Sequence, residues 1–163
     1  MAITDYTTYE DIRAVLGVSA DEIEDATLSL AVYELSLSSE FEDISANLKT
    51  DYATVSGLTS RTAVQERLFQ STRLFSTYAV AYQASGSLPL FSPKDISDGK
   101  ATVSRYADSP YKAVIEQIRT QYEKFKGKLE KAYAEYGSSS APVLVIRPFF
   151  NTASGAYDPV TNA

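Results

Sequence analysis

The fold of this chain is decided by the stretch at residues 61–84, which reads RTAVQERLFQSTRLFSTYAVAYQA. Its apolar side chains recur at the spacing typical of one face of an α-helix. The alanines between them permit a neighbouring helix to approach closely, and Gly86 marks the end of the pattern. We therefore predict a long helix over these residues with one buried stripe, formed by Val64, Leu68, Phe75, Tyr78 and Tyr82.

A second long helix is predicted for residues 110–136. Ser109 and Pro110 favour its start, because serine caps helices well and proline fits the first helical position. Gly137 is a stop signal, and Gly127 inside the pattern indicates a bend or a close contact. The predicted buried stripe is Val114, Ile118, Tyr122, Phe125, Leu129, Ala132 and Tyr136.

The N-terminal part predicts two more helices. Thr8 can cap a short helix that stops at Gly17, and Ser19 with Glu22 forms a capping box for a short acidic turn. A longer helix, followed by a loop at residues 51–60, is predicted from an apolar stripe at Leu30, Tyr33, Leu37, Phe41, Ile44 and Leu48. The whole pattern predicts a mainly α protein, a helical bundle of three long helices and one short helix over residues 1–137.

Residues 85–109 connect the two long helices and read SGSLPLFSPKDISDGKATVSRYADS. A connection of this length in a compact domain is usually functional. Its apolar side chains must pack on something. We therefore expect contacts with a neighbouring subunit or ring from Leu88, Leu90, Phe91, Ile96, Val103, Arg105 and Tyr106.

The segment Lys100–Tyr106 within this connection follows a tight-turn signal, Asp98-Gly99. Two interpretations stay open. The segment is either an exposed strand or arm that pairs with a neighbouring chain, or a surface loop folded onto its own helices. Pro93 makes the segment that precedes Lys100 a poor strand partner.

Residues 138–163 are predicted to form an extended C-terminal arm. The serines after Gly137 are typical of a flexible hinge, and the aromatic side chains further on are unfavourable in water. We expect contacts with a partner from Val143, Leu144, Val145, Ile146, Phe149, Phe150 and Tyr157.

The chain of 163 residues contains no cysteine and no histidine. It therefore has no disulfide framework, no Ser–His or Cys–His nucleophile and none of the common zinc sites. The remaining chemistry is that of paired carboxylates, a lysine nucleophile or carboxylate-bound magnesium. The densest acidic cluster, Glu40, Glu42 and Asp43, fits a solvated helix face better than an acid–base or metal site. We expect no catalytic residue, no metal and no cofactor.

No apolar stretch approaches the roughly 20 residues needed to cross a bilayer. The first residues are acidic and lack the features of a signal peptide. These observations predict a soluble, cytosolic protein.

The charge is spread unevenly. Residues 1–60 hold twelve acids and two bases, net −10, and residues 61–163 hold nine acids and thirteen bases, net +4. This polarity suits an oligomer in which an acidic face packs against a basic face. Two solvated faces of a monomer fit the same numbers.

The only basic run is Lys124–Lys131. It could contact nucleic-acid phosphates, but interleaved acids favour a solvated helix face with intrahelical pairs such as Glu123–Lys126 and Lys131–Glu135. The chain also has twelve tyrosines, most of which fit helix stripes. Better candidates for an interface are Tyr106, Tyr111 and Tyr157.

The run from Arg67 to Tyr133 resembles tailed-bacteriophage head–tail connector (adaptor) proteins. The resembling elements are a helix that ends near Gly86, the loop LPLFSPKDISDGKATVSRY and a basic helix that starts with proline. The opening segment YEDIRAVLGVSADEIED is similar too, and the resemblance covers about residues 8–136. The resemblance rests on the order of the helices and on the residues of the loop between them. The family offers no catalytic residue to carry over.

The resemblance implies a structural subunit of a ring, dodecameric by family analogy, that docks on the portal protein in the neck of the virion. A tail or stopper protein would lie below the ring, and DNA would pass through the channel without sequence-specific binding. The protein would lie in the host cytoplasm during assembly, and the C-terminal arm would bind the portal or a neighbouring subunit. A genome-packaging protein that binds nucleic acid, similar to a small terminase subunit, is the alternative, and a carboxylate-dependent enzyme is a third.

Overall fold

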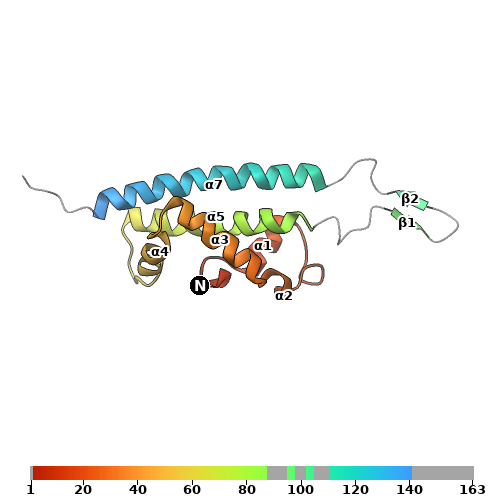
Figure 1. Cartoon of the computed structure of the whole chain (residues 1–163), viewed down its shortest axis with the longest axis horizontal. Helices are drawn as coiled ribbons and strands as arrows, with labels where there is room; N and C mark the ends of the chain where they lie inside the picture. The colour runs from red at the N-terminus through yellow and green to blue at the C-terminus, as the bar shows by residue number, and fades with distance from the viewer. Residues whose placement is uncertain (1, 88–94, 98–101, 105–110, 141–163) are drawn as a thin grey trace, which may run out of the picture.

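The computed structural model describes residues 2–87, 95–97, 102–104 and 111–140 (Figure 1). These residues form a mainly α helical bundle, as the periodicity predicts. Its long helices are α5 (Ala63–Ser85) and α7 (Tyr111–Ser140). The shorter elements are the 3-10 helix η1 (Ile3–Asp5), α1 (Tyr9–Leu16), α2 (Asp25–Leu28), α3 (Ala31–Ile44), α4 (Leu48–Ser56), β1 (Asp95–Ser97) and β2 (Thr102–Ser104).

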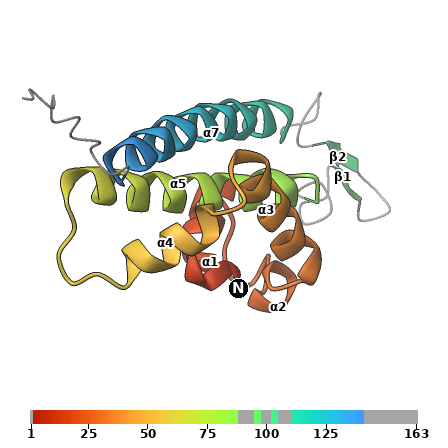
Figure 2. The same ribbon diagram turned by 60° about the vertical axis from the view of Figure 1, so that its left-hand side comes forward.

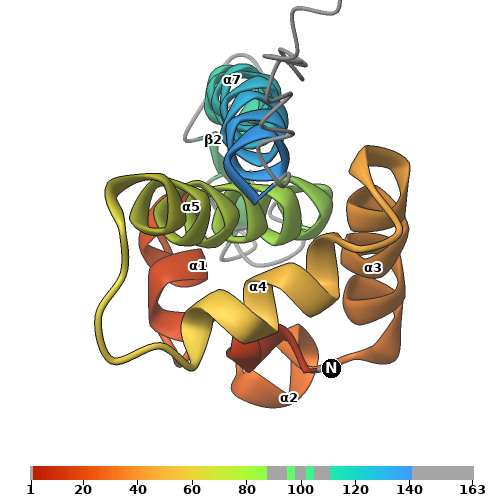
Figure 3. The same ribbon diagram turned by 90° about the vertical axis from the view of Figure 1, so that its left-hand side faces the viewer.

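The helices are stacked in three layers. α7 lies along α5 in the antiparallel direction, and α5 lies on a layer formed by α1, α3 and α4 (Figure 2). The view along the helix axes places α1 and α3 on opposite sides of α5 (Figure 3). α5 is therefore the central element, covered by α7 on one side and by the N-terminal helices on the other.

The burial of α5 matches its central position. Thr62 and Gln65 form a reciprocal capping box at its start, and Gly86 follows its last residue. Leu68 and Phe75 are fully buried. On the α7 side, Tyr78 stacks on Phe125 and Tyr82 on Tyr122, with ring centroids 4.9 and 5.4 Å apart. The predicted stripe is confirmed, although Val64, Tyr78 and Tyr82 are only partly buried.

The predicted signals around α1 are confirmed. The Thr8 hydroxyl accepts a hydrogen bond from the amide of Asp11 at 3.1 Å, and Gly17 adopts a left-handed φ of 72° after the last residue of α1. The Glu22 carboxylate accepts a bond from the amide of Ser19 at 2.7 Å. This box closes a turn and does not start a helix.

The predicted single helix through Leu30–Leu48 is wrong. The loop predicted for residues 51–60 is wrong over 51–56, which belong to α4, and confirmed over 57–60. Two helices, α3 and α4, meet at Ser45, whose backbone is extended with φ −168° and ψ 137°. The Ser45 hydroxyl accepts a hydrogen bond from the amide of Asn47, a local bond that competes with helix continuation. The stripe runs on through the break because Phe41 and Leu48 face the same core. Leu30, predicted as its first member, is 51% exposed, so the stripe starts only at Tyr33.

The predicted end of the last helix at Gly137 is also wrong, because α7 continues to Ser140. The hydroxyls of Ser138 and Ser139 donate to the carbonyls of Glu135 and Tyr136, each at 2.8 Å, so these serines belong to the last helical turn and not to a hinge. At Gly127 a Cβ would meet no atom within 4 Å, so no close contact explains this glycine. Ser109 and Pro110 lie outside the described residues.

The predicted α7 stripe is buried at Ile118, Leu129 and Ala132. Tyr122, Phe125 and Tyr136 pack on the core while partly exposed. Val114 is exposed, against the prediction.

The connection between α5 and α7 contains a short antiparallel hairpin. β1 pairs with β2 in the register Asp95–Ser104, Ile96–Val103 and Ser97–Thr102. The residues after Pro93 are therefore a strand partner, and the prediction that they are a poor one is wrong. The hairpin lies beyond the ends of α5 and α7 (Figure 1).

Candidate functional site

A polar cluster joins α3 to α7. The Lys126 ammonium and the Tyr122 hydroxyl each donate a hydrogen bond of 2.7 Å to the carboxylate of Glu40. Burial alone would raise the pKa of Glu40, but these two bonds and the Lys126 charge hold the pKa below its usual value. Burial and the same carboxylate raise the pKa of Tyr122. The cluster is thus an ion pair with a neutral tyrosine, which holds two helices together.

This cluster corrects the interpretation of Glu40, Glu42 and Asp43 as one solvated face. Only Glu42 and Asp43 are exposed, and Glu42 pairs with Lys49 at 2.6 Å. Within the described residues, no group of three or more acidic side chains could hold a metal ion.

The predicted intrahelical pairs of α7 are wrong too. Glu123 pairs with Arg119 at 3.2 Å, and Glu135 pairs with Arg67 of α5. The Lys126 side chain points to α3. The ammonium nitrogens of Lys124 and Lys128 lie 5.9 and 5.0 Å from the centre of the Phe125 ring. The run Lys124–Lys131 is therefore divided between two sides of α7 and does not form one continuous basic strip.

Tyr133 forms a second link between α7 and the N-terminal helices. Its hydroxyl donates to the Asp51 carboxylate at 2.8 Å and accepts from the Ser45 hydroxyl at 3.1 Å. The contact fixes the corner where α3 ends and α4 begins. Burial is the first cause of the raised pKa of Tyr133.

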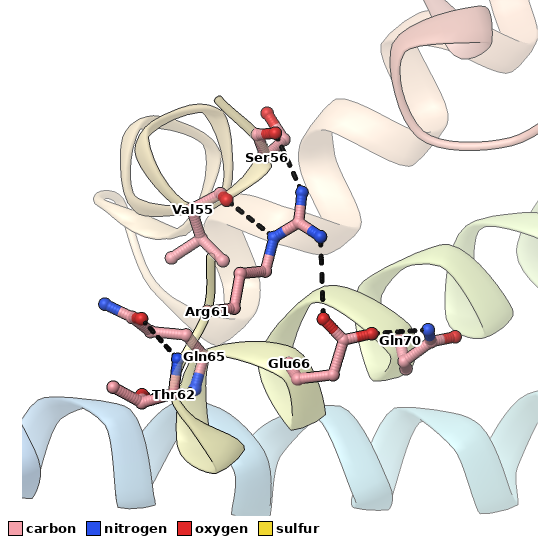
Figure 4. Close-up of polar contacts among 7 residues, drawn as sticks. All are labelled: Val55, Ser56, Arg61, Thr62, Gln65, Glu66 and Gln70. Carbon is pink, nitrogen blue, oxygen red and sulfur yellow. Dashed lines mark hydrogen bonds and ion pairs between the residues drawn. The ribbon is translucent and has the colours of Figure 1, made fainter. Parts of the chain in front are cut away.

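Arg61 holds the corner between α4 and α5 (Figure 4). Its guanidinium donates to the last carbonyls of α4, those of Val55 and Ser56, at 2.8 Å each. It also lies 4.0 Å from the centre of the Phe69 ring and pairs with Glu66 at 3.5 Å. The bonds satisfy carbonyls that a helix end leaves without a partner. Sequence reasoning missed this role, because a cation after a helix has no spacing signature of its own.

Arg13 was missed for a similar reason. Its side chain is almost fully buried, donates to the carbonyl of Ile23 at 2.8 Å and forms an ion pair with Asp25. It ties α1 to the acidic turn and to α2. An arginine on a predicted amphipathic helix is normally assigned to the exposed face. Only the packing of the helices shows that Arg13 is buried.

Most of the predicted contact residues lie outside the described part of the chain. This applies to Leu88, Leu90, Phe91, Arg105 and Tyr106 in the connection, and to Val143, Leu144, Val145, Ile146, Phe149, Phe150 and Tyr157 in the C-terminal arm. Ile96 and Val103 are placed opposite each other across the hairpin. Tyr111, expected at an interface, is partly buried and packs against the core. The two other tyrosine candidates, Tyr106 and Tyr157, are among the residues outside.

An exposed apolar surface lies on the outer side of α3 and just before it. Leu30, Val32 and Leu35 have 51, 62 and 70% of their surface exposed, and we call these three residues the α3 patch. Val32 and Leu35 are three residues apart and share one helix face. Two residues on from Leu35, Leu37 is 2% exposed and faces the core. Leu35 also lines a hollow of about 330 Å³ together with Ile3 and Tyr6. The three patch side chains nevertheless leave more than half of their surface exposed among the described residues.

A groove lies on the other side of the molecule, between α1, α5 and α7. It consists of three hollows of about 300, 400 and 330 Å³. The first shares Gln70 and Leu74 with the second. It shares Ala14, Val15 and Tyr78 with the third. Leu74 at its centre is 43% exposed. We call this surface the α1–α5–α7 groove. Sequence reasoning missed both surfaces, because Val32, Leu35 and Leu74 lie outside the predicted stripes and no spacing shows which exposed apolar residues adjoin one another.

The comparisons with known proteins add no assignment. Neither protein-family models, nor curated proteins, nor solved structures give a match to this chain. In the part of the chain that the structure describes, no helix is both long enough and apolar enough to cross a membrane.

Proposed function

We propose that this protein is a non-enzymatic structural subunit of a ring, a head–tail connector in the neck of a tailed bacteriophage. Its partners would be further copies of itself, the portal protein above and a tail or stopper protein below. DNA would pass through the channel without sequence-specific binding. The proposal rests on the resemblance of Arg67–Tyr133 to connector proteins and on the arrangement of that region in space.

The β1–β2 hairpin is the observation that carries this proposal. Two long antiparallel helices, α5 and α7, form a rigid support, and the paired strands β1 and β2 lie beyond their ends (Figure 1). A strand pair beyond the body of a bundle offers backbone donors and acceptors to a neighbouring chain. Such a projection suits a subunit that must contact its neighbours more than it suits an enzyme.

The described polar groups support a structural role as well. The Glu40–Lys126–Tyr122 cluster, the Tyr133 bonds and the Arg61 contacts each join two helices. Their donors and acceptors are used for holding the fold. The C-terminal arm and its expected contact with the portal stay a prediction, because residues 141–163 lie outside the described part.

Particle association tests the proposal. Virions of the phage that carries this gene are purified through a density gradient and analysed by quantitative mass spectrometry. A connector stays in the particle in a fixed ratio to the portal protein. If the protein is absent from the particles and the purified chain retards DNA in a gel, the packaging alternative holds and the connector proposal is wrong.

A further inference from the structure

The part of the sequence that contains the α3 patch is strongly acidic. Residues 14–48 hold eight aspartates and glutamates and no lysine or arginine. Three of these acids are in ion pairs, Asp25 with Arg13, Glu40 with Lys126 and Glu42 with Lys49. The segment that presents the most exposed apolar side chains of the described residues is therefore also the most negative part of the sequence.

The α1–α5–α7 groove has the opposite charge. Its lining includes four cations, Arg67, Arg73, Lys128 and Lys131, and two anions, Asp11 and Glu135. Both anions are paired with arginines of the same groove. The charges of the lining therefore sum to four minus two, an excess of two positive charges around the exposed Leu74.

The two surfaces lie on opposite sides of α5, since α3 flanks one side and α1 the other (Figure 3). A contact between the patch of one molecule and the groove of another joins two different surfaces. Such a heterologous contact leaves a free patch at one end of each pair and a free groove at the other. It therefore continues from subunit to subunit, and it gives a closed ring where the rotation between neighbours closes.

We infer that the α3 patch of one copy of this chain docks in the α1–α5–α7 groove of the next copy, with Leu35 near Leu74 and the acidic α2–α3 region against the basic rim. The inference rests on the proposed function, because it specifies the contact that builds the ring. Apolar burial would supply most of the affinity, and the complementary charges would fix which surfaces meet.

Cross-linking tests the contact directly, because the natural chain has no cysteine. A Leu35→Cys/Leu74→Cys double variant is treated at low salt with a short bis-maleimide and analysed on a denaturing gel. We expect a ladder of dimers, trimers and higher species. Each single variant should stay monomeric on the gel, because the heterologous contact keeps two copies of the same side chain apart. Dimers from a single variant would overturn the inference in favour of a two-fold contact.

Mixing two one-sided variants sharpens the test. Leu35→Asp blocks the patch and Leu74→Asp blocks the groove, and each alone should weaken assembly by about tenfold or more, as loss of a central interface residue does. Mixed together, they should form a heterodimer and nothing larger, through the one intact patch and the one intact groove. Leu58→Asp, at an exposed leucine that lines none of the three hollows, is the control that should assemble as the natural chain does.

The outcomes separate the inference from the proposed function. In one outcome the natural chain forms rings, but the Leu35→Cys/Leu74→Cys variant gives no ladder of cross-linked species and both one-sided variants still assemble. The ring then exists, and the inferred contact is wrong. If the natural chain forms no oligomer under any condition, both are overturned. A cross-link within one chain, between the groove and a cysteine introduced into residues 141–163, would show that the chain's own C-terminal arm occupies the groove, and would also overturn the inference.

Discussion

Helices α5 and α3 come from the same kind of apolar pattern but differ in what surrounds them. α5 is buried by α7 above and by the N-terminal helices below, and Leu68, Phe75 and Val80 have no exposed surface. α3 buries Leu37 and Phe41 on one face and exposes Val32 and Leu35 on the other. The difference indicates that α5 uses nearly all of its apolar side chains to stabilise the fold, whereas α3 uses those of one face and leaves those of the other exposed.

Replacing the centre of α5 should have the largest effect on stability. Phe75 is fully buried, with its ring 5.9 Å from the Phe41 ring of α3 and 5.7 Å from the Tyr122 ring of α7. Phe75→Ala removes a side chain shared by all three layers and should lower the free energy of unfolding by about 3–5 kcal/mol. Urea denaturation followed by circular dichroism measures this loss. A loss below about 1 kcal/mol would contradict the central position of α5.

A substitution at Arg61, just before α5, should cause the next largest loss of stability. Arg61→Ala leaves the carbonyls of Val55 and Ser56 without their charged donor and should destabilise by about 1.5–3 kcal/mol. Arg61→Lys is the matched control. A lysine keeps the charge but cannot make the forked contact, so it should recover only part of the loss. Full recovery by lysine would mean that charge alone matters at this corner.

A substitution of Glu40, on the inner face of α3, should lower the free energy of unfolding by a smaller amount that depends on pH. Because the pKa of Glu40 is lowered in the folded protein, its contribution is complete above the ordinary carboxyl pKa of about 4.3 and is lost as the pH falls through the lower folded value. Glu40→Gln should therefore cost about 1–2 kcal/mol at neutral pH, and progressively less in acid.

The control for Glu40 is Glu42→Gln on the same helix, since the Glu42–Lys49 pair is largely exposed. Its effect should be smaller than that of Glu40→Gln at neutral pH. Denaturation curves of the three proteins at several pH values decide the point. An effect of Glu40→Gln that grows in acid would contradict the assigned ion pair.

The outer face of α3 should show the smallest effect on folding. Leu35→Ser changes a side chain that is 70% exposed, so stability should stay within about 0.5 kcal/mol. Leu37→Ser, at a buried leucine of the same helix, should cost several times more and serves as the opposite control. Only Leu35→Ser should leave a folded protein that fails to assemble. Equal stability losses at both positions would remove the distinction between the two faces.

The elements that follow from the sequence are those fixed by local chemistry. The caps at Thr8 and Gly17 and the stripe of α5 need only neighbouring residues, and the sequence predicts them correctly. Periodicity, however, reports which side of a helix faces the core and not whether the helix continues. The break at Ser45 and the continuation of α7 past Gly137 were therefore missed.

The candidate site could be predicted only in part. Charge asymmetry between the two halves of the chain pointed to acidic and basic faces, but within the described residues part of that charge is paired inside one subunit, as Glu40 is with Lys126 and Asp11 with Arg73. The α3 patch and the groove depend on which helices flank α5. No spacing in the sequence gives that arrangement, because it follows from tertiary packing.

The proposed ring is tested most directly by electron microscopy of the purified protein at high concentration and low salt, alone and together with its proposed portal partner. We predict closed rings of one size with a central channel. The rings should loosen at high salt while the helical circular dichroism is retained, because screening weakens the charged contacts and leaves the cores intact. Particles that stay monomeric in low salt, even with the portal present, would contradict this prediction.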